Sequence, residues 1–104
     1  MATQDGKVLE LVVFTLRAGA SREELLGTVD AVSSWIAAQP GFVSRSLVED
    51  REGGRWIDVV WWRSMAEAQD AGARAMSSAS CAPMFGLIDM ESTVMVHGEL
   101  VHAA

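Results

Sequence analysis

The chain of 104 residues contains no tyrosine, no asparagine, two prolines and a single cysteine. Because Cys81 has no second cysteine to pair with, an internal disulfide is excluded, and the simplest expected location is the reducing cytoplasm. The longest apolar runs are far too short to span a bilayer, and no segment at the start resembles a secretory signal. We therefore expect no membrane partner.

Basic residues are also scarce, with 8 Lys and Arg against 14 Asp and Glu, a net charge of −6. An acidic chain is a poor partner for nucleic acid and for anionic membranes. Two histidines and one cysteine without close spacing cannot form a metal-ligand cluster. Gly53-Gly54 joins two predicted strands and is a turn, not a phosphate loop. The sequence predicts no metal and no cofactor.

What the chain does contain is enough apolar material for one core, since half of its residues are hydrophobic. Its length predicts one domain over residues 1–104, with residues 1–6 as a flexible polar tail. Alternating or continuous apolar patterns predict strands over residues 7–16, 42–50, 55–63 and 90–101.

Two helices are predicted between these strands. Ser21 and Glu24 form a capping-box pattern for a helix to about residue 39, and Ser64 and Glu67 form another for residues 64–79. A short helical turn is expected near Met84. The order predicts a ferredoxin-like βαββαβ fold of the α+β class, a four-stranded antiparallel sheet with both helices on one face.

The segment from Arg55 to Arg63 holds three of the four tryptophans and one acid, Asp58. In a strand, side chains alternate between faces, so Trp56, Asp58, Val60 and Trp62 share one face. The other face carries Ile57, Val59 and Trp61. Both faces are apolar, but parity alone does not say which of them meets the helices.

Two helices cover only one face of such a sheet, yet three of its strands are apolar on both faces. An uncovered apolar face of this size is unusual for a monomer. The sequence therefore predicts a homodimer in which two sheets stack face to face.

The second helix has an inner stripe of small residues that includes Ala68, Gly72 and Ala75. Either the helix packs closely on the sheet, or the missing volume is a cavity for a small molecule. Four strand residues are candidate polar groups for such a cavity: Asp58, His97, Arg45 and Glu10. Asp58 is either a base or a structural partner of Arg45, and His97 is either a proton carrier or a satisfied strand residue.

Several features resemble the dimeric α+β barrel superfamily, and most of all the antibiotic biosynthesis monooxygenase-like domains. They are Pro40-Gly41-Phe42 before the second strand, Trp62 at the end of the third, Ser64 to Ala68 opening the helix, and Phe85 with Ile88 before the last strand. The resemblance implies the dimeric barrel fold and a cofactor-independent oxygenase acting on polycyclic phenols. The absence of tyrosine and asparagine departs from the polar pocket of those enzymes. A second helix without histidine disfavours haem degradation.

These patterns lead to one hypothesis and its alternative. The hypothesis is a cofactor-independent monooxygenase for a planar aromatic, phenolic or quinone-like molecule. Asp58 and His97 would be its catalytic residues, and Trp56, Trp62, Phe42 and Arg45 its substrate-binding residues. The alternative is a homodimer without catalysis, which binds a small molecule or has a structural or stress-associated role.

Overall fold

The computed structural model describes residues 6–104. The elements run in the order β1 (Val8–Phe14), α1 (Arg22–Leu26), α2 (Val29–Ala37), β2 (Phe42–Asp50), β3 (Arg55–Trp62), α3 (Met65–Ala75), α4 (Ala82–Phe85), the 3₁₀ helix η1 (Met90–Ser92) and β4 (Val94–Glu99). The predicted tail lies outside the described residues except for Gly6, which is buried.

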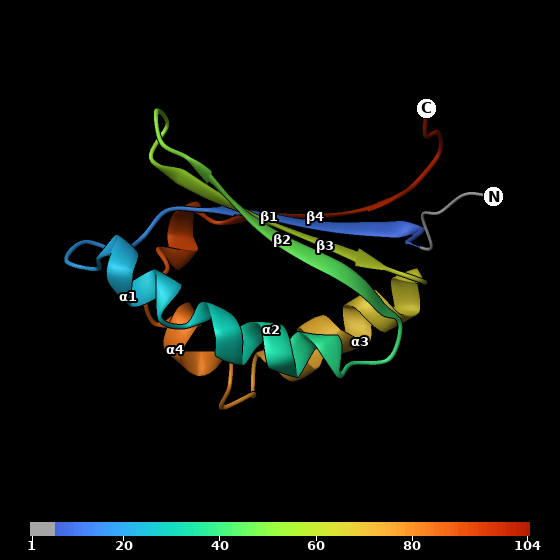
Figure 1. Ribbon diagram of the computed structural model, residues 1–104, viewed down its shortest axis with the longest axis horizontal. Helices are drawn as coiled ribbons and strands as arrows, with labels where there is room; N and C mark the ends of the chain where they lie inside the picture. The colour runs from blue at the N-terminus through green and yellow to red at the C-terminus, as the bar shows by residue number, and fades with distance from the viewer. Residues whose placement is uncertain (1–5) are drawn as a thin grey trace.

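The four strands form one antiparallel sheet in the order β2-β3-β1-β4. Figure 1 shows the α-helices gathered on one side of this sheet, while the β2–β3 hairpin and the C-terminal segment bend toward the other side. The predicted ferredoxin-like α+β fold is therefore confirmed. Within residues 6–104, no helix has the length and apolar character needed to cross a membrane.

The first predicted helix is in fact two helices, α1 and α2, with a break at Gly27 and Thr28. The capping box at its start is formed, because Ser21 Oγ accepts from the Glu24 amide and the Ser21 amide donates to the Glu24 carboxylate. The break follows from Thr28, whose backbone N–H and hydroxyl both donate to the Leu25 carbonyl, at 2.9 and 2.7 Å. These short-range bonds close the turn and end α1.

Other boundaries also differ from the sequence prediction. Helix α3 ends at Ala75 rather than near residue 79, because the following serines bond back to its last carbonyls. Strand β4 begins at Val94 rather than Met90, since Asp89 caps the 3₁₀ helix η1 in front of it. Of the second capping box, only the bond from the Glu67 amide to Ser64 Oγ is formed as predicted; the Glu67 carboxylate accepts from the Ser64 hydroxyl.

The alternation predicted for β3 is present, and it is the face with Asp58 that meets the helices. Trp56, Asp58, Val60 and Trp62 are all buried, whereas Ile57, Val59 and Trp61 are half-buried on the helix-free face. Buried apolar residues form two clusters under the sheet. One is centred on Phe14, Trp56 and Met84, the other on Trp62 with Ala68 and Ala71 of α3.

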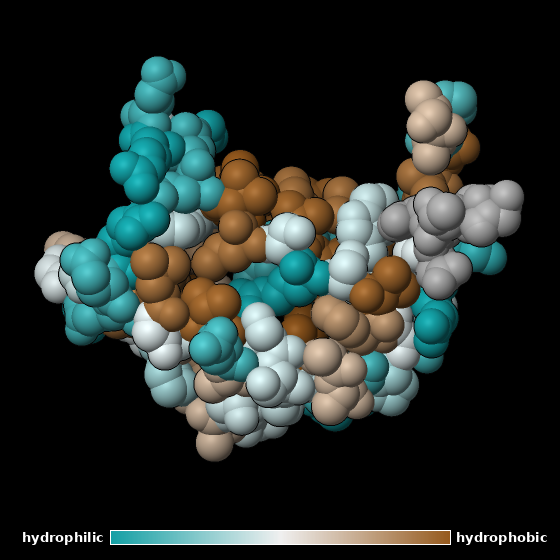
Figure 2. Space-filling view, viewed as in Figure 1, coloured by the Kyte–Doolittle hydropathy of each residue, from teal (hydrophilic) through white to brown (hydrophobic). Residues whose placement is uncertain are grey.

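The helix-free face is apolar across the middle of the sheet, as the sequence predicts. Register pairs Leu11 of β1 with Val59 of β3 and with Val96 of β4, so these side chains form one row across the three strands. Figure 2 shows apolar surface along this side, between the polar β2–β3 hairpin and the C-terminal segment. Val48, Val94 and Val96 are each about half exposed there, at 45, 56 and 48%.

Candidate functional site

A cavity of about 140 Å³ lies between the sheet and the helices. Its walls are almost entirely apolar, with side chains of β1 and β3 above and of α2, α3 and α4 below. The polar groups that border it are few and lie mainly on the strands: Glu10, Arg45, Asp58 and, before β4, Thr93. An apolar cavity with a few fixed polar groups is the usual form of a small-molecule site.

The small residues of α3 explain why the protein's own side chains do not fill this space. At the start of the helix, Ala68 and Ala71 are fully buried and pack beside Trp62 and Val60. One turn later, Gly72 and Ala75 border the cavity, and a Cβ added at Gly72 would meet nothing within 4 Å. Both sequence alternatives are therefore realised in one helix, close packing at its start and missing volume toward its end.

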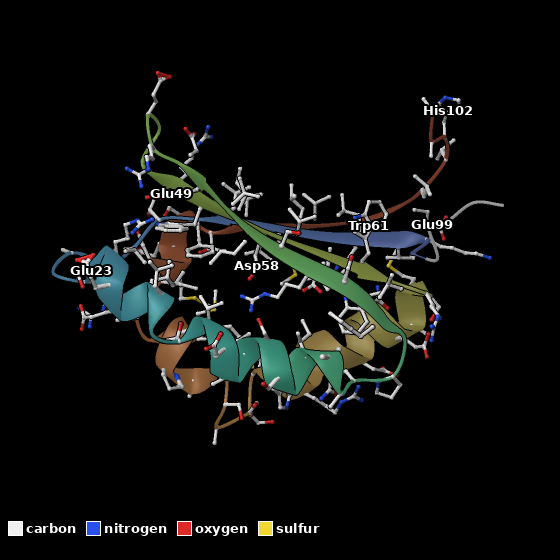
Figure 3. The ribbon with its side chains drawn as sticks, viewed as in Figure 1. Glu23, Glu49, Asp58, Trp61, Glu99 and His102 are labelled. Carbon is white, nitrogen blue, oxygen red and sulfur yellow. The ribbon has the colours of Figure 1, made fainter. Side chains whose placement is uncertain are left out.

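The centre of the polar side is an ion pair between β2 and β3. Arg45 donates from Nε to Asp58 Oδ1 at 2.9 Å and from Nη2 to Asp58 Oδ2 at 2.7 Å. The two side chains are only 5 and 11% exposed. Arg45 Nη1 also donates to Ser33 Oγ of α2 at 3.0 Å, so the guanidinium ties the sheet to the helix layer. Figure 3 shows Asp58 on the helix side of the sheet.

Glu10 of β1 is the second buried acid of the site. The Trp62 indole N–H donates to Glu10 Oε1 at 2.9 Å, and Glu10 as a whole is 8% exposed. Burial raises the pKa of the Glu10 carboxyl above its ordinary 4.5, with a small further rise from Asp58. The Trp62 hydrogen bond and nearby His97 oppose that rise in pKa.

His97 of β4 is the direct cross-strand partner of Glu10. Its Nε2 lies 4.0 Å from Glu10 Oε2, and its side chain is 22% exposed. Within the described part of the chain, Nε2 is the one buried side-chain nitrogen or oxygen without a hydrogen-bond partner. His97 does not border the cavity itself but lies behind Glu10.

The aromatic residues singled out from the sequence lie beside the cavity rather than on it. Trp56 and Trp62 are 7 and 0% exposed and belong to the two core clusters. Phe42 contacts Trp62 edge to face, with ring centroids 6.0 Å apart. None of these three is among the residues that border the cavity, and Trp62 reaches the site through its bond to Glu10.

The tryptophan that does border the cavity is Trp35 of α2, which the sequence hypothesis did not assign to the site. The available signal was its helical spacing from Val32, three residues earlier; Ile36 follows Val32 by four, and both also border the cavity. Glu10 carried a similar signal as the lone acid in an apolar strand. It shares the parity of Val8, Val12 and Phe14, and Val8 and Phe14 are buried.

Three methionines mark the edge where the cavity meets solvent. Met76 follows α3, Met90 lies in η1 and Met95 in β4, and all three border the cavity while remaining 68, 54 and 54% exposed. Their flexible thioethers adapt easily to a ligand surface. Among residues 6–104, no three His, Cys, Asp and Glu side chains are grouped so that they could hold a metal ion.

No protein-family model matches the sequence, and no curated protein matches it either. Solved structures do match, over nearly the whole chain. The monooxygenase ActVA-Orf6 of Streptomyces coelicolor, in complex with nanaomycin D, has a TM-score of 0.71 at 19% identity and covers 96% of this chain and 92% of its own.

Two further structures give the same result. The cofactor-independent oxygenase SnoaB of Streptomyces nogalater has a TM-score of 0.63 at 19% identity, with 95% of both chains covered. Rv0793 of Mycobacterium tuberculosis has a TM-score of 0.70 at 21% identity, covering 93% of this chain and 97% of its own. The chain thus has the fold of the antibiotic biosynthesis monooxygenase-like proteins, and the resemblance seen in the sequence is confirmed at the level of fold.

Proposed function

We propose that this protein is an enzyme of the cofactor-independent monooxygenase kind, acting on a planar phenolic or quinone-like molecule held in the cavity. The observation that carries the proposal is the combination of an apolar cavity with the buried Arg45–Asp58 pair on its sheet side. An apolar wall suits an aromatic ring, and a buried guanidinium suits an oxygen substituent on that ring. The structural likeness to SnoaB, described as a cofactor-independent oxygenase, is in keeping with this kind of reaction.

The cavity volume limits the size of the ligand. A cavity of roughly 150 Å³ in another protein binds benzene, so the 140 Å³ here suits one aromatic ring. Further rings of a larger ligand would extend past the exposed Met76, Met90 and Met95. Trp35 takes the ring-contact role in this proposal, while Trp56, Trp62 and Phe42 support the wall from behind.

The reaction proposed is the oxidation of an activated CH₂ group to a ketone. A base removes a proton from the CH₂ carbon, and the carbanion adds to dioxygen to give a peroxide. After the peroxide is protonated, loss of water leaves C=O, so one oxygen atom enters the product and the other leaves as water. In the hypothesis drawn from the sequence, the base that removes this CH₂ proton is Asp58 or His97. We assign Asp58 to holding Arg45, because both Asp58 oxygens already accept from that guanidinium.

The test is oxygen uptake by the purified protein with a panel of anthrones and hydroquinones. With the anthrones, which carry the activated CH₂ group, we expect consumption of one dioxygen per ketone formed, and its loss in a Gly72→Leu variant whose side chain enters the cavity. An Ala73→Leu variant changes an exposed position of the same helix and should keep the wild-type rate. No uptake above the uncatalysed background across the panel would count decisively against an enzyme.

The alternative function is binding without turnover, and one observation favours it. Asp58 is already paired with Arg45, and one Glu10 oxygen with Trp62, as in a site built only to hold a ligand. Trp35 at the cavity wall would report ligand entry by fluorescence. Saturable quenching with no product would support the binding alternative. For a purely structural or stress-associated dimer, we expect neither quenching of tryptophan fluorescence nor product.

We also propose that two copies of the chain form a homodimer through the helix-free face of the sheet. The support is the apolar row of Leu11, Val59 and Val96 on a face that the helices leave uncovered. The lone, buried Cys81 is compatible with the cytoplasmic location proposed for this dimer. Sedimentation of the wild-type protein at micromolar concentration measures the assembly directly.

A further inference from the structure

Glu10 and His97 form a second pair of polar side chains at the site, separate from the Arg45–Asp58 ion pair. Glu10 and His97 are opposite each other on β1 and β4, and both side chains are on the helix side of the sheet. The Trp62 indole fixes one Glu10 oxygen at 2.9 Å. Among the described residues, no donor lies at hydrogen-bond distance from the other oxygen, Oε2. Glu10, which borders the cavity, thus has one carboxylate oxygen without a donor among the described residues.

His97 lacks a partner on the side that faces this oxygen. Its Nε2 is buried without a hydrogen bond within residues 6–104, and Glu10 Oε2 lies 4.0 Å from it. Once Glu10 is protonated, a small rotation of the ring lets the Glu10 O–H donate to Nε2, which satisfies this buried nitrogen. The side chain is 22% exposed, so the exposed part of the ring lies away from Nε2. The pair therefore connects the cavity, through Glu10, with solvent, through His97.

We propose that Glu10 is the group that takes the proton from the ligand, and that His97 carries this proton from Glu10 to solvent. The inference rests on the proposed enzymatic function. In the step, the C–H bond of the ligand breaks, its electron pair stays on carbon and the proton goes to Glu10 Oε2. Neutral His97 then takes the proton on Nε2 and releases one from Nδ1 to water.

The environment of Glu10 fits this role better than that of Asp58. A proton on Asp58 would remove the negative charge that pairs with the buried Arg45, whereas no donor among the described residues binds Glu10 Oε2. Burial in the apolar wall also raises the pKa of Glu10, which makes its carboxylate the stronger base.

The charged and titratable groups around Glu10 lie on the other strands. Asp58 on β3 and His97 on β4 act on Glu10 directly, and Arg45 on β2 borders the same cavity. From the helix side, α2 and α3 contribute no titratable group to the cavity wall, and the residue before α4 contributes the buried thiol of Cys81. Burial is therefore the largest influence of the fold on the pKa of the Glu10 carboxyl.

The experiment measures proton removal without oxygen, so that it is independent of the oxygenase reaction. The full chain is incubated anaerobically in D₂O with 2-indanone or anthrone, whose CH₂ protons are acidic, and deuterium entry is followed by NMR. We expect the wild type to catalyse exchange and Glu10→Gln to lower the rate by about 100-fold or more. Glutamine keeps the acceptor for Trp62, so ligand binding, followed by tryptophan fluorescence, should be retained.

Two further variants guard against a folding defect. Glu10→Asp keeps a carboxylate and should retain part of the exchange, whereas Glu23→Gln on the exposed surface of α1 should keep the full rate.

The variant His97→Gln tests the carrier role. It should slow exchange by about tenfold at low buffer concentration and be rescued by added imidazole, which replaces a proton carrier but not a structural residue.

The outcomes separate the two proposals. Wild-type exchange that persists in Glu10→Gln overturns the assignment to Glu10, and so does binding of both ketones with no exchange. A rate in His97→Gln that imidazole does not raise overturns the carrier role. Exchange that depends on Glu10 but is followed by no oxygen uptake supports the assignment and overturns the oxygenase reaction.

Discussion

Arg45 and Asp58 lie on neighbouring antiparallel strands and are joined by two charge-assisted hydrogen bonds, of 2.9 and 2.7 Å, inside an otherwise apolar layer. They are not direct cross-strand partners, since Arg45 is opposite Val60 and Asp58 is opposite Leu47. The guanidinium reaches diagonally to the carboxylate. The pair therefore places two opposite charges at the cavity wall with almost no net charge.

The first prediction concerns the stability of this pair. Replacing one member, as in Asp58→Leu or Arg45→Met, leaves the other charge buried and should lower the free energy of unfolding by about 3–5 kcal/mol. The double variant Arg45→Met/Asp58→Leu should be more stable than either single variant, because no unpaired charge remains. Urea denaturation of the four proteins measures the coupling.

A second Arg–Asp pair on the surface provides the matched control. Arg55 donates to Asp50 at 2.9 Å, but Arg55 is 56% exposed, so solvent screens the interaction. Arg55→Met should cost far less than Arg45→Met. Equal losses at the two pairs, or additive losses in the Arg45/Asp58 cycle, would contradict the prediction.

The second prediction uses Gly72, where α3 borders the cavity. Gly72→Ala should stabilise the protein by about 0.5–1 kcal/mol, because glycine in a helix interior is costly and the added methyl group has free space. Gly72→Leu should instead fill the cavity and abolish ligand-induced quenching of tryptophan fluorescence while the protein stays folded.

Ala68 on the same helix gives the opposite case. It is fully buried against the sheet, so Ala68→Leu should overpack the core and destabilise by about 1–3 kcal/mol. Thermal unfolding followed by circular dichroism measures both changes. A Gly72→Leu protein that still binds ligand with unchanged affinity would show that the ligand does not occupy this cavity.

The order of elements and the faces of the strands could be predicted because they follow from local patterns. Parity placed Trp56, Asp58 and Trp62 on one face, and the structure confirms that grouping. Parity could not say that this face meets the helices, since Ile57 and Trp61 make the other face equally apolar. That choice is made by tertiary packing of α2 and α3.

Other features of the site depend on contacts that no single segment contains. The break between α1 and α2 was not predicted because the apolar stripe continues across it, from Leu25 to Val32, while Thr28 ends the first helix locally. Three tryptophans close together suggested a ring-binding wall, but large rings equally well fill a core. Trp35 borders the cavity and Trp62 does not, because α3 packs closely on the sheet beside Trp62 and leaves space further along. The strand and helix patterns of the sequence do not contain this packing.

The third prediction concerns pH and stability. Burial raises the pKa of Glu10 above 4.5, so the folded protein holds this proton more tightly than the unfolded chain does. Folding is therefore favoured by Glu10 when it is protonated, and this contribution is lost as pH rises from about 4.5 through the folded pKa. Relative to Glu10→Gln, the wild type should lose stability over that window.

The measurement is the free energy of unfolding of both proteins between acidic and neutral pH. Asp50 acts in the opposite direction, because hydrogen bonds from the Gly53 amide and from Arg55 lower its pKa. Its contribution is present above 3.8 and disappears as pH falls through the lowered value. Since Asp50 is unchanged in both proteins, it cancels in the difference. A difference that is flat with pH, or that grows with pH in favour of the wild type, would contradict the shift at Glu10.

The fourth prediction concerns the helix-free face of the sheet. Val96 is 48% exposed and lies beside Leu11 in the middle of this face, so a lysine there leaves the single chain folded. In a dimer that stacks sheet on sheet, the two-fold symmetry brings each lysine into a buried apolar contact without a partner charge. Val96→Lys should therefore weaken dimerisation by about 100-fold or more, given that several kcal/mol are lost per buried unpaired charge.

Sedimentation equilibrium over a concentration series measures this change, with Leu26→Lys as the control. Leu26 is also an exposed apolar residue, at 42%, but it lies on α1 in the helix layer, away from the face in question. The control should dimerise like the wild type. If Val96→Lys and wild type have the same dissociation constant, the two copies do not associate through this face. If wild type and Val96→Lys are both monomers at every concentration, the homodimer proposal is wrong, and the apolar row of Leu11, Val59 and Val96 is exposed to water.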